Sequence, residues 1–119
     1  MGEQSELIEI IVHSLPSYAQ IRVVPGTGTT HICVAWKVND IPSRPNKTSK
    51  PIDIQVTSEA ADEFDRRVFY ARKQTTDKIY SYIQKRLLNF NQANDAPYGS
   101  VCPAEIWHVN KELIEKLTT

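Results

Sequence analysis

The middle of this chain lacks the two residues that most often interrupt secondary structure. Residues 52–96 contain no Gly and no Pro, and the residues from 58 to 92 have helical spacing of their apolar positions. One long helix or two shorter helices would both satisfy that spacing. Helices beyond about 25 residues are uncommon in a small domain, and Thr75 or Thr76 followed by Asp77 is typical of a fresh helix start. We therefore predict two helices with a break at this point.

Each half of this stretch has apolar residues three or four positions apart, which is the spacing of one buried helix face. In the first half these residues are Ala60, Ala61, Phe64, Val68 and Ala71. In the second half they are Ile79, Tyr80, Ile83, Leu87 and Phe90. Thr57 or Ser58 precedes a run of acids, and an oxygen-bearing cap followed by acids suits a helix N-terminus. We expect the first helix to begin there.

Alternating β-branched and other apolar residues predict strands on both sides of the helical stretch. Residues 21–24 and 31–38 flank a Gly-containing loop, which is typical of a hairpin, and 52–56 alternate cleanly. We expect residues 104–109 to form a last strand after Pro103. The strand side chains expected to face the core are Ile32, Val34, Trp36, Val38, Ile52, Ile54 and Val56.

Two further helices are predicted at the ends of the sequence. Residues 5–15 have apolar side chains on one helical face, with acids in the first turn and Pro16 just after the end. A β-branched strand is the alternative for this segment, and the acids and the proline favour the helix. Asn110 is expected to cap a short final helix, whose apolar side is Leu113, Ile114 and Leu117.

These elements predict an α+β fold in the order α-β-β-β-α-α-β-α. One-sided helices and alternating strands require a three- to four-stranded, mainly antiparallel sheet with the helices packed on one face. At 119 residues, the chain is expected to form a single domain over 1–119. Residues 39–51 contain three prolines and no apolar pattern, so we expect a flexible loop there.

Composition points to a soluble, cytoplasmic protein. No apolar run approaches the roughly 20 residues that cross a bilayer, so we expect no membrane association. The first residues lack the basic segment of a secretory signal. Cys33 and Cys102 lie far apart and lack the density of a disulfide scaffold, which favours reduced thiols in a cytoplasm.

The charges are balanced in total but not along the chain. Lys plus Arg and Asp plus Glu both number 14, yet residues 51–65 hold five acids and no cation, whereas 66–86 hold seven cations and one acid. One interpretation is helical ion pairing, of Asp62 with Arg66 and of Glu63 with Arg67 at i, i+4. The alternative is a surface that binds nucleic acid or another polyanion. Its predicted binding residues are Arg66, Arg67, Arg72, Lys73, Lys78, Tyr82, Lys85 and Arg86.

Catalytic and metal motifs are weak. His31 and Cys33 would share one face of a strand, so a Cys-dependent enzyme is an alternative hypothesis. A cysteine in a strand rich in Val and Ile is more often a small buried hydrophobe. Cys102 and His108 lie six apart, a spacing that no common zinc module uses, and we expect neither a metal nor a cofactor. The predicted function is a small interaction or regulatory module without catalytic activity, whose partner is a protein or a second copy of the chain.

Overall fold

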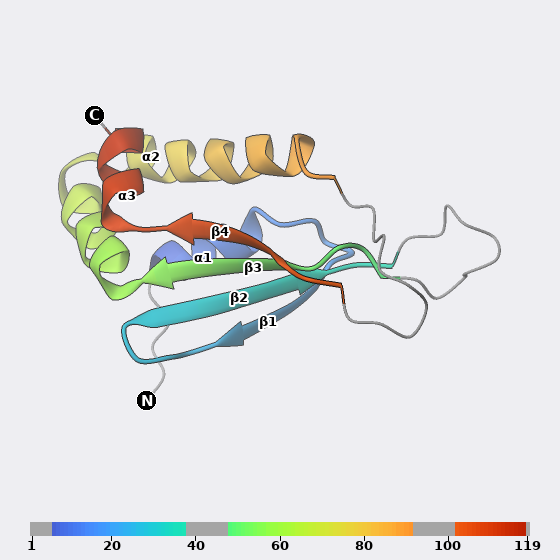
Figure 1. Cartoon of the computed structure of the whole chain (residues 1–119). Coiled ribbons are helices and arrows are strands. Elements are labelled where there is room, and N and C mark those ends of the chain that lie inside the picture. The colour runs from blue at the N-terminus through green and yellow to red at the C-terminus, as the bar shows by residue number, and fades with distance from the viewer. Residues whose placement is uncertain (1–5, 38–47, 92–101, 119) are drawn as a thin grey trace.

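Four strands form one mixed sheet in the computed structural model of this chain, which describes residues 6–37, 48–91 and 102–118 (Figure 1). The elements are α1 (Glu6–His13), β1 (Gln20–Val24), β2 (Thr29–Ala35), β3 (Ile52–Thr57), α2 (Ser58–Leu88), β4 (Glu105–Val109) and α3 (Lys111–Thr118). Strands β1, β2 and β3 are antiparallel neighbours, and β4 joins the other edge of β3 in parallel. The predicted α+β class and the mainly antiparallel sheet are confirmed.

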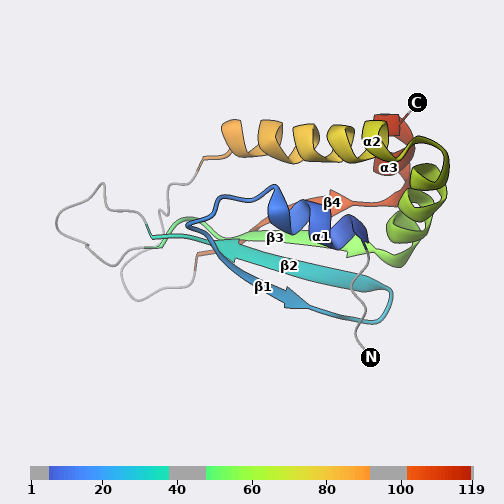
Figure 2. The ribbon, with the colours of Figure 1, turned by 180° about the vertical axis from the view of Figure 1, so that it is seen from behind.

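The parallel pair requires a long connection, because the chain must return to the same end of the sheet before β4 can begin. Helix α2 provides that return and lies on one side of the sheet together with α1 (Figure 2). Helix α3 packs against α2. The helices therefore leave the other face of the sheet uncovered, as one-sided helices predict.

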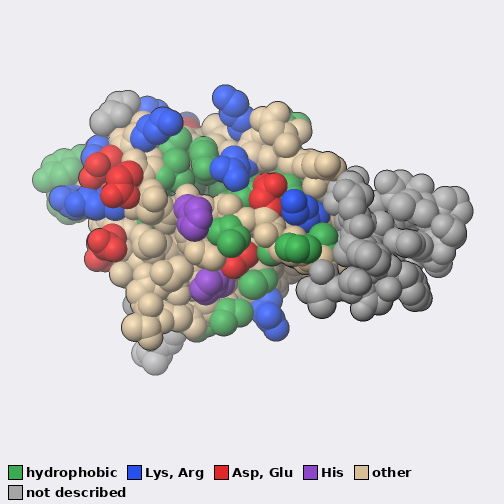
Figure 3. Space-filling model, in the orientation of Figure 1, with side chains coloured by type: hydrophobic (Ala, Val, Ile, Leu, Met, Phe, Trp, Pro, Cys, Tyr) green, Lys and Arg blue, Asp and Glu red, His purple; other side chains and the backbone are tan. Residues whose placement is uncertain are grey.

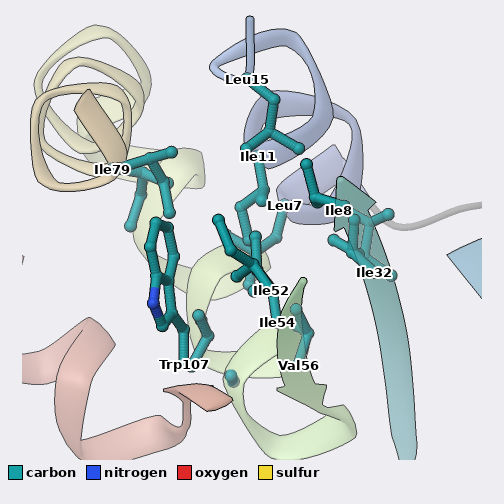
Figure 4. Close-up of a cluster of buried hydrophobic side chains, with 14 of the residues drawn as sticks. Leu7, Ile8, Ile11, Leu15, Ile32, Ile52, Ile54, Val56, Ile79 and Trp107 are labelled. Carbon is teal, nitrogen blue, oxygen red and sulfur yellow. The ribbon is translucent and has the colours of Figure 1, made fainter. Parts of the chain in front are cut away.

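The core lies between the sheet and the helices (Figure 4). Ile54 of β3 is the central strand residue, with Ile32 of β2 on one side and Trp107 of β4 on the other. Above them lie buried side chains of α1 and α2, including Ile11 and Ile79. Burying side chains of this kind stabilises the fold by about 1.5–3 kcal/mol each. The predicted inward residues of β2 and β3 are confirmed, whereas Val38 and most of the predicted loop at 39–51 lie outside the described residues.

Both predicted helix caps, at the starts of α2 and α3, are confirmed. The hydroxyl of Thr57 accepts a hydrogen bond of 3.1 Å from the backbone N–H of Ala60. The side-chain oxygen of Asn110 accepts one of 2.9 Å from the N–H of Leu113. Each cap satisfies a backbone donor that has no partner within its helix. These caps fix where α2 follows β3 and where α3 follows β4.

Helix α2 is interrupted at Ala71, whose φ of −144° and ψ of 60° lie outside the helical region. The two halves of α2 run in clearly different directions (Figure 1). A break was predicted, but its predicted position near Thr75 and Thr76 is wrong. Thr75 is 2% exposed within the second half of α2, where it packs inward instead of capping a new helix. Tyr80 was predicted in the core and is wrong as well, because it is 49% exposed.

The N-terminal segment is helical, as the acids and the proline favoured. Leu7 and Ile11 of α1 are fully buried against the sheet. Within the segments that the structure describes, no helix has the combination of length and apolar character needed to span a bilayer.

Candidate interaction surface

Arg66 and Arg67, the first cations of the basic block at 66–86, are bound to one buried carboxylate. The side chain of Glu63 is 4% exposed and accepts hydrogen bonds of 2.5 Å from Arg66 and 2.6 Å from Arg67. The hydrogen bond from Arg67 holds the pKa of Glu63 below its usual range. Burial opposes that shift, whereas the charges of both arginines and of Lys111 reinforce it. The predicted pair of Glu63 with Arg67 is confirmed, and Arg66 binds Glu63 instead of Asp62.

Three more of the predicted binding residues are engaged within the fold. Arg72 forms an ion pair with Glu6 of α1, and Lys73 lies 3.4 Å from Asp77 one turn later. Arg86 lies with its guanidinium carbon 4.8 Å from the centroid of the Trp107 ring. It also donates a hydrogen bond of 3.2 Å to the hydroxyl of Tyr82. These contacts tie α2 to α1 and to β4, so Arg72 and Arg86 already serve the packing of the fold.

Lys78 and Lys85 differ from the other predicted binding residues. Neither forms an ion pair with any residue in 6–37, 48–91 or 102–118. Both lie on the solvent side of α2 and line a shallow groove between α2 and α3. The remaining lining residues are Asp77, Ser81, Tyr82 and Leu117. Of the eight predicted residues, the structure therefore gathers Lys78, Tyr82 and Lys85 at this groove and distributes the others along α2.

Among the described residues, the acidic block at 51–65 and the basic block at 66–86 form ion pairs with each other only at their junction. Glu63 is paired at the junction, but the exposed acids around it, Glu59, Asp62 and Asp65, form no ion pair with described residues. Lys78 and Lys85 lie after the break at Ala71, and neither has an acidic partner among the described residues. Folding therefore leaves an acidic end and a basic end on the surface of α2.

Two consecutive aromatic residues lie between those ends. Phe69 and Tyr70 are 82% and 85% exposed, and their rings meet edge to face with centroids 5.0 Å apart. They end the first half of α2, directly before Ala71. Figure 3 shows hydrophobic side chains beside acidic and basic ones at the end of the molecule where α2 changes direction. Sequence reasoning did not single out Phe69, although its position off the apolar stripe of Phe64 and Val68 was a readable signal.

A pocket lies beside these rings, at the break in α2. Its lining residues are Glu63, Arg66, Arg67, Tyr70, Ala71, Thr75 and Thr118. The two arginines share one carboxylate there, so the pocket has one excess positive charge. Tyr70, one of the two exposed rings, also lines this pocket.

The uncovered face of the sheet contains His31 and Cys33, the two residues behind the hypothesis of a Cys-dependent enzyme. His31 of β2 lies with Nδ1 3.0 Å from a carboxylate oxygen of Asp53 in β3, and Gln55 donates to the other oxygen at 3.1 Å. Cys33 lies opposite Asp53 in the sheet. In the described part of the chain, Cys33 makes no hydrogen bond to His31. The proposed base therefore contacts the carboxylate and not the thiol.

Histidine side chains are visible on this uncovered face in Figure 3. His108 of β4 shares the row of His31 and Gln55 across the sheet. Among the residues that the structure places, no group of three or more His, Cys, Asp or Glu side chains is arranged to hold a metal ion.

Comparison of this chain with protein-family models, with curated proteins and with solved structures finds no match in any of the three.

Proposed function

We propose that this chain is a protein-interaction module without catalytic activity, and that its contact surface centres on Phe69 and Tyr70. The exposure of these two adjacent rings, 82% and 85%, carries the proposal. A phenylalanine ring in water adds no burial energy to the isolated fold, whereas its burial against a partner would recover about 1.5–3 kcal/mol. Aromatic residues are also enriched where binding energy concentrates in protein interfaces.

The surroundings of the pair have the polar rim of an interface. Asp65 and Arg66 lie one turn before Phe69 on the exposed side of α2. Charged groups around an aromatic centre contribute orientation and specificity more than affinity. We place this module in the cytoplasm, because Cys33 and Cys102 are both free thiols, which suits a reducing compartment.

The test is affinity capture with the full chain and with the double variant F69S/Y70S. Partners identified by mass spectrometry are then purified, and their affinities for each variant are measured by calorimetry. We expect the double variant to lose binding by about tenfold or more, as interface hot spots do. The matched control is Y80S, which alters a partly exposed aromatic residue of the second half of α2. Equal affinities of wild type and F69S/Y70S for every captured partner would refute the proposal, provided that circular dichroism shows both folded.

A second candidate function is the binding of a polyanion such as single-stranded nucleic acid. The observation in its favour is that Lys78 and Lys85 are unpaired among described residues and line one groove with Tyr82. Binding of a fluorescent oligonucleotide should weaken steeply with salt. In K78E/K85E, the slope of log affinity against log salt should fall by about 1.4, which corresponds to two lost phosphate contacts on a single strand. The control is K73E/K111E, since both of these lysines already have acidic partners. Affinity that is independent of salt would exclude this function.

A further inference from the structure

We infer that the partner at this surface is a second copy of the chain, bound antiparallel along the exposed face of the first half of α2. This inference rests on the proposed interaction surface and adds the identity of the occupant and its orientation. A pairing of this kind would use the same residues in both copies about a two-fold axis.

The face is continuous over about two turns of the helix. Asp62, Asp65, Arg66 and Phe69 are all exposed, and their spacing of three or four places them on one side. The opposite side contains the fully buried Ala60 and Phe64. The first half of α2 is therefore anchored through one face and presents the other to solvent.

Two charged side chains on this face, Asp65 and Arg66, can each form a further ion pair. Asp65 has no ion pair within the described residues. The side chain of Arg66 is 65% exposed even though it donates to Glu63, and a guanidinium has five N–H donors. An acid and a cation thus stand next to each other, each able to accept a further partner.

An antiparallel arrangement pairs Asp65 and Arg66 of each copy with Arg66 and Asp65 of the other. If the two-fold axis passes between positions 65 and 66, Asp65 of one copy faces Arg66 of the other, and the second pair repeats the first. Phe69 then faces Asp62 of the other copy and lies beside the small side chain of Ala61. A parallel arrangement would instead place Asp65 on Asp65 and Arg66 on Arg66, which is repulsive. The charge pattern is therefore complementary to itself in one orientation only.

The first experiment measures the mass of the whole chain in solution. Sedimentation equilibrium from about 5 to about 500 µM covers the range in which a small interface of this kind associates. We expect a reversible dimer. In F69S, its dissociation constant should be at least tenfold higher than in the wild type. A monomer at every concentration would overturn the inference. It would leave the proposed interaction surface standing if F69S/Y70S still abolished the binding of another protein.

The second experiment uses opposite charge reversals. In D65R the contact between the copies brings two arginines together, and in R66D it brings two aspartates together, so neither variant should dimerise alone. In an equal mixture, Arg66 of D65R meets Asp65 of R66D, and the two introduced side chains meet each other. We score this heterodimer by its mass. The wild type mixed with each variant gives the reference affinity, because one of its two contacts keeps opposite charges. The control is a charge exchange at the Lys111 and Glu115 pair of α3, K111E mixed with E115K, which should leave self-association unchanged.

The two contacts of each pairing decide what the mixtures should show. A wild-type copy against D65R keeps one contact of Asp65 with Arg66 and gains one contact between two arginines, so its affinity should lie between those of the wild type and of D65R alone. In the mixture of D65R with R66D, one contact joins the two introduced side chains and the other joins Asp65 to Arg66. Both contacts then have opposite charges, and the mixture should recover the affinity of the wild type. Failure of the mixture to exceed either variant alone would overturn the antiparallel pairing.

The folding of R66D must be checked, because Arg66 also binds the buried Glu63. If R66D unfolds, D65R decides alone, since Asp65 has no described contact to lose. A dimer of D65R as tight as that of the wild type would overturn the antiparallel pairing. A dimer that also tolerates F69S would overturn the use of this face altogether.

Discussion

Arg86 lies over the indole ring of Trp107, with its guanidinium carbon 4.8 Å from the ring centroid. Trp107 is 1% exposed and its indole N–H donates a hydrogen bond of 2.6 Å to Glu105. Arg86 is therefore the cation that joins the end of α2 to β4. A planar guanidinium stacks on an aromatic ring more effectively than an ammonium does.

We predict that R86K lowers the free energy of unfolding by about 1 kcal/mol, although it preserves the charge. Urea denaturation monitored by tryptophan fluorescence measures this change. K85A, one position away and exposed, should change the free energy by less than about 0.5 kcal/mol. Equal stabilities of R86K and the wild type would show that the stacking contributes nothing.

Stability should fall at acidic pH partly through Glu63. Its pKa is lowered in the folded chain, so the ionised form is favoured by folding. The resulting stabilisation is complete above the usual value of 4.5 and is lost as the pH falls through the lowered folded value. E63Q should therefore unfold at a lower temperature than the wild type at pH 7, with a difference that narrows below pH 4.5. Thermal melts at several pH values test this. A difference that is constant with pH would contradict the assignment, and E112Q is the exposed control.

Phe64 and Phe69 provide a matched comparison on the same helix. Phe64 is fully buried and Phe69 is 82% exposed. F64A should destabilise the fold by about 3–5 kcal/mol through lost burial and a cavity. F69A should change the free energy by less than about 0.5 kcal/mol. Denaturant midpoints at low protein concentration measure both. A large destabilisation by F69A would mean that its ring supports the fold and is not reserved for a partner.

The reactivity of the Cys33 thiol should not depend on His31. Because His31 contacts Asp53, we expect the rate of iodoacetamide alkylation of Cys33 and its pH profile to be the same in H31A and in the wild type. Both chains are compared with Cys102 replaced by Ser, so that a single thiol is followed by mass spectrometry. A slower reaction in H31A would revive the hypothesis of a Cys-dependent enzyme.

Local patterns predicted most of the fold because they are properties of neighbouring residues. The alternation of Ile52, Ile54 and Val56 specified a strand with one buried face, and Thr57 specified the start of the helix that follows. Neither required knowledge of the rest of the chain. The parallel pairing of β3 with β4, in contrast, joins segments that are distant in sequence, and no local pattern indicates its direction.

The errors in α2 have one physical origin. The break at Ala71 changes the direction of the helix, and contacts with the rest of the fold, which local spacing does not specify, decide which side of the second half is buried. Thr75 is buried and Tyr80 is exposed as a result. The same limit applies to the surface, because the sequence could not indicate that Arg66 reaches Glu63 while Asp65 keeps no described partner.

The parallel position of β4 also governs how the chain is made. A polypeptide leaves the ribosome from its N-terminus, so β1, β2 and β3 can pair while α2 is still being synthesised. During that interval the outer edge of β3 presents unpaired backbone N–H and C=O groups, which other strands can bind. Only the arrival of Glu105–Val109 covers that edge. A chain that lacks Glu105–Val109 therefore exposes a strand edge that the complete fold covers.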